Sequence, residues 1–296
     1  MIVSDSSIDI SFAGKLKAFF ELTKFRLSLT VVFSSSFGYL LGIQRPINWV
    51  HFALFAVAGY AITSAANTVN QIKEVELDKL MKRTAGRPLP TGRLSISEAW
   101  GFVILMLALS MFIFITVFNY KTAGIALLSF VLYGFVYTPL KRVGPIAVFV
   151  GAFPGAFPPM IGWLAATNHF GWEPGILFAI QFFWQFPHFW AIAWVADEDY
   201  RRAGFKLLPA QGEKGFDTAV QIMIYTLFLL PLSWVPLKLG MTGINSAIIA
   251  MICGILFLAQ TFHLMRKQTD KAALKMMFGS FLYLPVVQIA FLLDKI

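Results

Sequence analysis

The sequence predicts an all-α polytopic membrane protein with about nine transmembrane helices, and three observations support this fold class. First, 58% of the 296 residues are hydrophobic and 13% are charged, whereas a soluble domain has roughly 45–50% apolar and about 25% charged residues. Second, the apolar residues form runs that approach the roughly 20 residues a helix needs to cross a bilayer. Third, Lys and Arg gather on one predicted side of the membrane. Together these features exclude a soluble globular domain.

The apolar runs are continuous rather than alternating, so they predict helices and not the strands of an outer-membrane barrel. We expect Pro154, Pro158 and Pro159 to break the fifth helix at membrane depth, where protein or a cavity must satisfy the freed backbone groups. No linker divides the chain, which predicts one integral-membrane domain over residues 1–296 with a polar N-terminal segment, 1–20. The predicted spans are residues 25–43, 50–70, 99–118, 121–137, 145–164, 174–195, 217–237, 244–263 and 276–293.

The charge distribution predicts an orientation. With a cytoplasmic N-terminus, 20 of the 24 Lys and Arg residues fall in inner segments, and the outer segments hold only Arg45, Lys121, Lys238 and Lys295. Positive charge collects in cytoplasmic loops, which also explains the net charge of +9 without a nucleic-acid partner. The first twenty residues lack an apolar core and a cleavage site, so we expect no signal peptide. A bacterial inner (cytoplasmic) membrane is the expected location, with the lipid bilayer as partner.

Acidic residues lie at the predicted inner end of the second span. Asn70, Glu74 and Asp78 are spaced i, i+4 and i+8, which places them on one face of a helix. Their oxygen atoms suit Mg²⁺, a hard cation that commonly bridges to substrate phosphates. An ordinary solvated loop with local ion pairs is an equally good interpretation of this segment taken alone.

Basic residues follow in a loop rich in proline and glycine. Arg83 and Arg87, with Lys82 beside them, are suited to binding phosphate oxygens. Carboxylates with metal on one side and these cations on the other form the arrangement that a diphosphate needs.

A second acidic cluster follows the sixth span. Asp197, Glu198 and Asp199 precede Arg201 and Arg202, again at a predicted inner end. A helix end with a solvated turn is the alternative. Two such clusters in equivalent places could together hold two metal ions on one diphosphate, with Asn70, Glu74 and Asp78 as the other metal ligands.

The sixth span carries many aromatic residues and one histidine, His188. An ionisable residue inside a membrane span is a functional candidate, although a helix–helix hydrogen bond explains a lone intramembrane histidine equally well. Some of the aromatic side chains could line a tunnel for an isoprenoid and shield a carbocation.

These motifs resemble the intramembrane aromatic prenyltransferase (UbiA-type) superfamily. The row formed by Asn70, Glu74 and Asp78, the run Arg83-Thr84-Ala85-Gly86-Arg87-Pro88 and the second acidic loop carry this resemblance. Within the superfamily, residues 137–142, 151–159 and 187–190 are similar to the protohaem IX farnesyltransferases, or haem O synthases. The likeness extends from about residue 20 to 293.

The resemblance implies nine helices around a central cavity and a Mg²⁺-assisted transfer of farnesyl from farnesyl diphosphate to a vinyl group of haem B. It implies catalytic and metal roles for Asn70 and the acidic residues Glu74, Asp78, Glu198 and Asp199. It also implies diphosphate binding by Arg83 and Arg87, and we expect Lys82, Arg201 and Arg202 to join them. His188 is expected near the haem, as an iron ligand or a propionate partner. Tyr200 joins it as a haem-side candidate. Many superfamily members have Asp at the position of Glu74, and haem O synthases often have a basic residue at that of Asp197. Which of the acids at 197–199 bind metal therefore stays open.

Two other functions remain as alternatives. A prenyltransferase could act on a quinone precursor or another aromatic acceptor. A small-solute transporter could use broken helices and intramembrane polar groups, although it would need a polar path through both halves of the bilayer, and the charge here lies on one side. Haem A synthase and terminal oxidase subunits are candidate protein partners of a haem O synthase.

Overall fold

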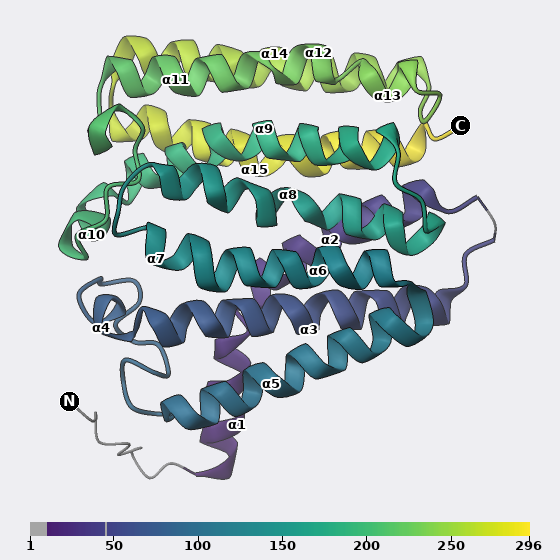
Figure 1. Ribbon diagram of the computed structural model, residues 1–296. Helices are drawn as coiled ribbons and strands as arrows, with labels where there is room; N and C mark the ends of the chain where they lie inside the picture. The colour runs from purple at the N-terminus through teal and green to yellow at the C-terminus, as the bar shows by residue number, and fades with distance from the viewer. Residues whose placement is uncertain (1–10, 45) are drawn as a thin grey trace.

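The computed structural model describes residues 11–44 and 46–296. Figure 1 shows a bundle of long helices, and within the described residues the only β pairing is an isolated bridge between Thr242 and Lys295. The predicted all-α class is confirmed. The first ten residues of the predicted polar segment 1–20, and Arg45 in the first outer loop, lie outside the described residues.

Eight helical stretches of the described chain are long and apolar enough to cross a membrane. Three are built from consecutive pieces, namely α5 with η1, α6 with η2 and α7, and α11 with α12 and α13. All eight match predicted spans to within a few residues. They are α3 Trp49–Lys73; α5 Ile96–Ile113 with η1 Phe114–Phe118; α6 Tyr120–Val131 with η2 Leu132–Tyr137 and α7 Thr138–Leu140; α8 Ile146–Thr167; α9 Trp172–Val195; α11 Phe216–Leu227 with α12 Leu229–Leu232 and α13 Val235–Lys238; α14 Ile244–Lys267; and α15 Asp270–Leu293.

The first predicted span, 25–43, forms helix α2, Phe25–Gly42, but it is not one of the eight. It carries serines 34–36 at its centre, which lower its mean hydropathy. Ser34 and Ser35 are buried, so these two hydroxyl groups face the protein interior. A ninth crossing by α2, like the cytoplasmic N-terminus, remains a prediction. A separate helix, α1 Phe12–Leu22, precedes it.

Helix α8 corrects the prediction of a broken fifth span, because it runs without interruption through Pro154, Pro158 and Pro159. A proline removes the hydrogen bond to the carbonyl four residues earlier, so Pro158 and Pro159 free the carbonyls of residues 154 and 155. Neighbouring helices supply the missing donors. The hydroxyl of Ser129 donates to the Pro154 carbonyl at 3.2 Å, and the amide of Gln181 donates to the Gly155 carbonyl at 2.8 Å.

Helices α2 and α8 pack with almost no space between their backbones. A Cβ atom at Gly38 would lie 1.9 Å from the Pro159 carbonyl oxygen, and one at Gly162 would lie 1.9 Å from the Ser35 carbonyl oxygen. Small residues permit this approach, which lets dispersion forces hold helices together in lipid. The contact fixes α8 at the centre of the bundle, and over half of α8 is buried.

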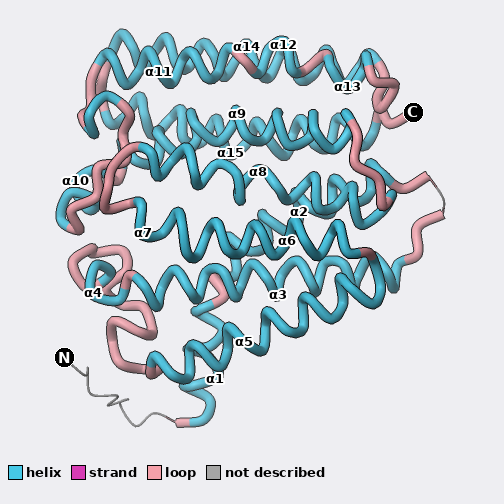
Figure 2. Tube along the Cα trace, viewed as in Figure 1, coloured by secondary structure: helices cyan, strands magenta, loops and turns pink. Residues whose placement is uncertain are grey.

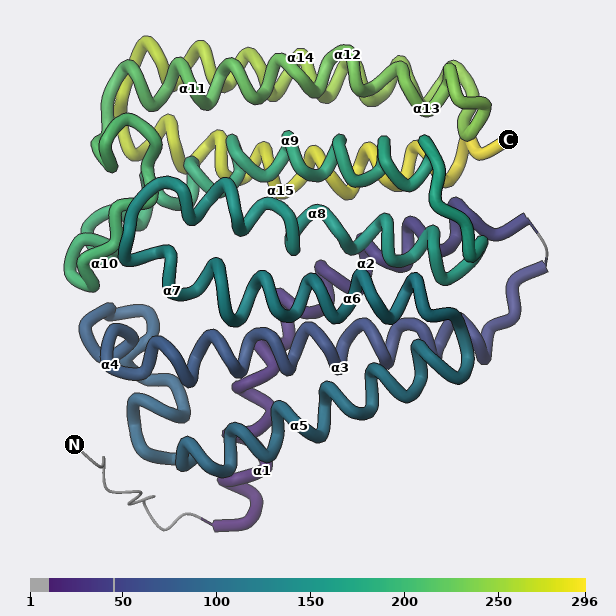
Figure 3. Tube along the Cα trace, viewed as in Figure 1, coloured from purple at the N-terminus to yellow at the C-terminus, as the bar shows by residue number. Residues whose placement is uncertain are grey.

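The short helices gather at one end of the bundle. In Figures 2 and 3, α4 Val75–Asp78, α7 and α10 Asp197–Arg202 lie at the left end with the loops that follow α3 and α9. Both acidic clusters therefore lie at the same end of the protein, next to the ends of the long apolar helices.

Candidate functional site

The first cluster lies at a bend, which differs from the continuous helix that the spacing predicts. Helix α3 ends at Lys73, and Glu74 has φ −110° and ψ 12° before α4 begins. The register survives the bend, because the Glu74 amide donates to the Asn70 carbonyl at 3.1 Å and the Asp78 amide donates to the Glu74 carbonyl at 2.7 Å. Asn70, Glu74 and Asp78 are all buried, with at most 4% of each residue exposed.

Each of these three buried side chains contacts a cation from a different part of the chain. The Lys24 ammonium donates to Oδ1 of Asn70 at 3.1 Å. Lys141 lies 2.9 Å from Oε1 of Glu74. The three acceptors and three cations form what we call the acceptor–cation array.

The third pair of the array is bifurcated. One nitrogen of the Arg87 guanidinium, Nη1, donates to both carboxylate oxygens of Asp78, at 2.9 Å and 2.7 Å. The Asp78 side chain is completely buried, while 27% of the Arg87 side chain is exposed. Arg87 is thus placed where one side binds the protein and the other remains accessible to an anion.

The backbone and the surroundings of Lys24 are unusual. Its φ of 49° is in the left-handed region, where a residue with a side chain is strained by about 1–3 kcal/mol, a cost often found at functional sites. Burial, followed by the nearby positive charges of Arg87 and Lys141, lowers the pKa of Lys24 to about 7. Because this pKa is close to neutral pH, a bound anion would stabilise the charged form of Lys24.

Lys141 behaves differently although it is also enclosed. Burial alone would lower its pKa, but the Glu74 carboxylate and the Tyr133 and Tyr200 hydroxyls together raise it above the ordinary value. Its ammonium also lies 4.9 Å from the centre of the Tyr137 ring. Lys141 therefore stays charged at neutral pH.

In the second cluster most charges are paired within α10 itself. Arg201 donates to Asp197 at 2.9 Å and lies 3.6 Å from Glu213. Arg202 contacts Glu198 and, at 3.3 Å, Asp199. The Glu198 side chain is 85% exposed, so it points away from the array, whereas 16% of the Asp197 side chain and 20% of the Asp199 side chain are exposed.

Arg83 connects the two clusters. Its guanidinium lies 4.5 Å from the centre of the Tyr200 ring. Burial lowers its pKa, but Tyr200, Asp199 and Asp78 together raise it, so acids of both clusters act on this one cation. Tyr200, predicted to face the haem, belongs to this charged end, and Lys82 lies exposed.

The donor set at the array fits magnesium, although a metal cage is not preassembled. Among residues 11–44 and 46–296, no three Asp, Glu, His or Cys side chains are grouped closely enough to hold a metal ion. The donors are oxygens, which Mg²⁺ prefers. Oε1 of Glu74 is paired with the Lys141 ammonium at 2.9 Å but accepts no hydrogen bond. Asn70, Glu74 and Asp78 could therefore hold Mg²⁺ once their present cations move.

His188 lies away from the array, inside the bundle. It is seven residues before the end of α9, and its Nδ1 is 2.8 Å from the Ser280 hydroxyl of α15. The ring stacks on Trp184 with 4.4 Å between centres. The two predicted haem-side residues, His188 and Tyr200, thus lie in different environments.

Sequence reasoning did not identify Lys24 and Lys141 as site residues, and it treated them only as inner positive charges. They are 46 and 67 residues from their partners in the sequence, so no local spacing could pair them. Lys141 lies within residues 137–142, a segment that resembles the protohaem IX farnesyltransferases, and this resemblance could have marked it as a site residue.

Comparisons with known proteins identify the family of this chain. A model of the UbiA prenyltransferase family matches residues 31–284. A protoheme IX farnesyltransferase of Cytophaga hutchinsonii is 56% identical over 284 residues, which cover 96% of this chain and 99% of that protein. A mitochondrial protoheme IX farnesyltransferase of Arabidopsis thaliana is 34% identical over 95% of this chain and 65% of its own length.

Solved structures show the same fold at low sequence identity. A digeranylgeranylglyceryl phosphate synthase aligns with a TM-score of 0.80 and 22% identity, covering 95% of this chain and 98% of its own. A UbiA homologue from Archaeoglobus fulgidus, solved with DMAPP and Mg²⁺, aligns with a TM-score of 0.68 and 18% identity over 92% and 98% of the two chains. With a family match over most of its length and close relatives over nearly all of it, the chain belongs to the UbiA prenyltransferase family.

Proposed function

We propose that this multi-pass membrane protein is a haem O synthase, which transfers the farnesyl group of farnesyl diphosphate to a vinyl group of haem B. The observation that carries the proposal is the acceptor–cation array, in which Lys24, Lys141 and Arg87 surround three buried oxygen donors at one end of an apolar bundle. The relatives named protoheme IX farnesyltransferase supply the acceptor. A bacterial inner membrane, and contact with haem A synthase or oxidase subunits, are part of the same proposal.

The array binds the diphosphate by exchanging partners. Lys24, Lys141, Arg87 and Arg83 each carry donors that a diphosphate oxygen can accept, and charge-assisted bonds of this kind are about twice as strong as neutral ones. When these cations move to the diphosphate, Glu74 and Asp78 are left with free carboxylate oxygens beside it. Magnesium, when bound there, supplies positive charge that offsets the negative charge of the leaving group.

The reaction needs no nucleophile from the protein. The bond between C1 of farnesyl and the diphosphate oxygen breaks, and the electron pair leaves with the diphosphate, where the preorganised cations stabilise it. The haem vinyl group forms the new bond to C1. Water adds to the resulting cation and releases a proton, which leaves a hydroxyl group on the product. The aromatic rings around α9, such as Phe182 and Phe186, keep the surroundings apolar.

A membrane assay with haem B, farnesyl diphosphate and Mg²⁺, read by mass spectrometry, tests this function. The expected product is a haem heavier by one farnesyl and one hydroxyl group, formed by the wild type and not by Glu74→Gln. Asp270→Asn is the matched control, because Asp270 forms an exposed pair with Lys214 away from the array. If diphosphate were released only with a 4-hydroxybenzoate-type acceptor, the acceptor would be an aromatic ring and not haem. If folded protein released no diphosphate with either acceptor, the prenyltransferase proposal would be rejected.

A further inference from the structure

A pocket of about 380 Å³ lies at the end of the bundle that carries the short helices. Helices α8, α9 and α11 form its sides, and the segment between α10 and α11 closes it through residues 209–211. Figure 1 shows α9 between α8 and α11, with that segment at the left. The side chains on the three helices are Ile146 and Phe149, Phe186 and Trp190, and Gln221 and Tyr225. Its volume is in the range of roughly 300–1,000 Å³ that is typical of small-molecule sites.

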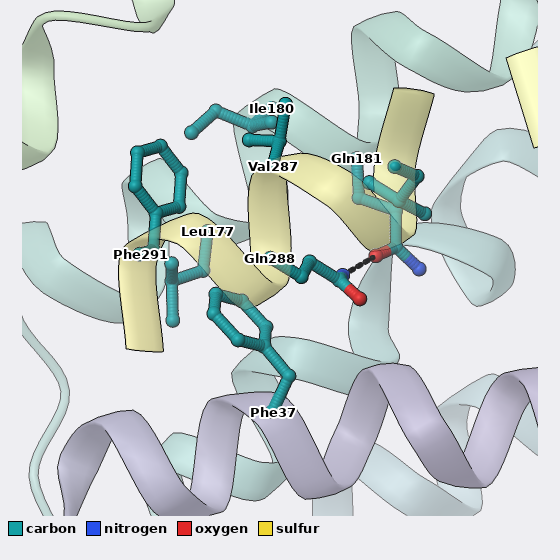
Figure 4. Close-up of a pocket in the computed structure, with 8 residues that line it drawn as sticks. Phe37, Leu177, Ile180, Gln181, Val287, Gln288 and Phe291 are labelled. Atoms are coloured by element: carbon teal, nitrogen blue, oxygen red, sulfur yellow. Dashed lines mark hydrogen bonds between the residues drawn. The ribbon is translucent and has the colours of Figure 1, made fainter. Parts of the chain in front are cut away.

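A second cavity is too small to hold such a ligand. It has a volume of about 10 Å³ and lies beside Gln181 and Gln288, whose side chains are joined by a hydrogen bond of 3.2 Å (Figure 4). A space of this size holds one water molecule at most. The argument for a ligand site therefore concerns the larger pocket.

Helix α8 separates this pocket from the acceptor–cation array. A Cβ atom at Gly151 of α8 would lie 2.7 Å from the Tyr137 ring. The centre of that ring is 4.9 Å from the ammonium of Lys141, so this side of α8 faces the array. Phe149 is two residues away, on the opposite side of the helix, and it is 44% exposed. The pocket is thus distinct from the proposed substrate site and opens to the outside of the bundle.

The pocket lies where the helices reach the surface of the bilayer. Ile146 is the first residue of α8, and Gln221 is the sixth residue of α11. Trp190 is five residues before the end of α9 at Val195. At 1.5 Å per residue, these side chains are within about 8 Å of the helix ends. A ligand in this place would have one part in hydrocarbon and another part in the interface, where Trp and Tyr are common.

Several polar side chains of the pocket have no partner in the protein. The indole nitrogen of Trp190 is buried without a hydrogen-bond partner, and only 5% of Trp190 is exposed. Within the part of the chain that the structure describes, the side chains of Gln211, Gln221 and Tyr225 form no hydrogen bond either. A buried donor without an acceptor is destabilising. These groups therefore favour a ligand that carries neutral oxygen acceptors.

The remaining lining restricts the chemical class of the ligand. None of the ten residues around the pocket is Asp, Glu, Lys, Arg or His, so a charged group inside it would be unpaired. One wall is aromatic, because the ring centres of Phe186 and Tyr225 are 4.2 Å apart and those of Trp190 and Tyr225 are 5.1 Å apart. An apolar chain that ends in neutral carbonyl groups fits this lining.

Two cations lie near the pocket in the sequence but outside it. Arg142 is three residues before Pro145, and Lys206 is three residues before Pro209. Both residues are exposed, and neither forms an ion pair within the described residues. Exposed Lys and Arg next to a membrane attract anionic lipid head groups. The ligand therefore has a negative group beyond its neutral carbonyls.

We propose that this pocket binds one phospholipid of the leaflet at the charged end of the bundle. An acyl chain lies against the aromatic wall, the ester carbonyls accept hydrogen bonds from the unpartnered donors, and the phosphate stays outside near the two cations. The inference does not require haem to be the acceptor, so it is independent of the proposed function. The competing interpretation is a groove that bulk lipid and detergent fill without a preferred occupant.

Photolabelling of the wild-type protein tests the site without any variant. The full chain is placed in vesicles with a phosphatidylglycerol that carries a diazirine on its acyl chain close to the ester. We expect residues 145–149, 186–190 and 221–225 to receive several-fold more label than Ile104 and Leu105, which are more exposed apolar residues of α5. Labelling that simply follows the exposure of apolar side chains would overturn the proposal.

Variants of α11 test retention of the lipid. Gln221→Trp fills the pocket, whereas Ile224→Trp adds the same side chain at an exposed position of α11 outside it. Native mass spectrometry after detergent exchange should show one bound phosphatidylglycerol on the wild type and on Ile224→Trp, and none on Gln221→Trp. Tyr225→Phe should weaken binding by about 5-fold, the effect of one neutral hydrogen bond.

The outcomes keep this proposal apart from the proposed function. Equal lipid retention by the wild type and Gln221→Trp, or no retention by either, would reject the site whatever the enzyme activity. Haem O formation by Gln221→Trp would show that this variant is folded. If the wild type retained the lipid and formed no haem O, the proposed function would fail and the lipid site would stand.

Discussion

The buried pair between Glu74 and Lys141 offers a quantitative test of the array. Only 5% of the Glu74 side chain and 12% of the Lys141 side chain are exposed, so neither charge can be hydrated after its partner is removed. Breaking a buried pair from one side costs about 3–5 kcal/mol of stability. Lys141→Met leaves the Glu74 carboxylate buried without its cation, so we expect it to lower the free energy of unfolding by about 3 kcal/mol, the lower end of that range.

The double variant distinguishes pairing from packing. Glu74→Gln combined with Lys141→Met leaves neither member of this pair charged and unpaired, so its loss should be smaller than the sum of the two single losses by about 2–3 kcal/mol. The assay is unfolding in mixed micelles with increasing dodecyl sulfate, followed by far-ultraviolet circular dichroism. As a control, Lys214→Met breaks an exposed pair with Asp270 and should cost under about 1 kcal/mol. Additive single losses, or a Lys141→Met loss as small as that of the control, would refute the argument.

Three other predictions concern the site and the bundle. Asp78→Asn should lower turnover at least about 100-fold, as removal of one preorganised electrostatic group does, while the circular dichroism spectrum stays unchanged. The pKa of Lys24, lowered to about 7, predicts that kcat/KM for farnesyl diphosphate falls as the pH rises through 7, and that Lys24→Arg removes this step. Stability should rise over the same window, from about pH 7 to 10, because the unfolded chain binds the extra proton there; a pH titration of unfolding checks the sign. Gly162→Ala should cost about 1–3 kcal/mol by forcing α2 from α8, whereas Gly101→Ala, with open space around it, should stabilise by roughly 0.5–1 kcal/mol.

The sequence predicts the helices well because lipid leaves the chain few choices. Long apolar runs must satisfy their own backbone groups as helices, and eight of nine predicted spans appear as such. Helix α2 is not among the eight because it contains several serines. One of them, Ser34, donates a hydrogen bond to Gln181, which is 147 residues away in the sequence. A window of sequence counts such a serine as polar and cannot see the partner that makes it acceptable in the interior.

The site was predictable only where local spacing decides it. Asn70, Glu74 and Asp78 come together because one hydrogen-bonded ladder joins them, even across the bend. Lys24 and Lys141 arrive from distant segments, and only the fold places them. Glu198 shows the opposite case, because it follows Asp197 directly and yet the short helix α10 turns it outward.

The carbonyls freed by the prolines of α8 also determine how that helix is aligned with its neighbours. Dispersion contacts between apolar helices change little when one helix slides along another, so they select a register weakly. Ser129, Gln181 and Gln185 each donate to one particular carbonyl of α8, at residues 154, 155 and 152. A slip of one turn would leave these donors and acceptors unpaired in hydrocarbon. Pro158 and Pro159 thus give an apolar helix a unique alignment, because the two carbonyls that they free each have one fixed donor. Through Gln181 the same alignment extends to α9.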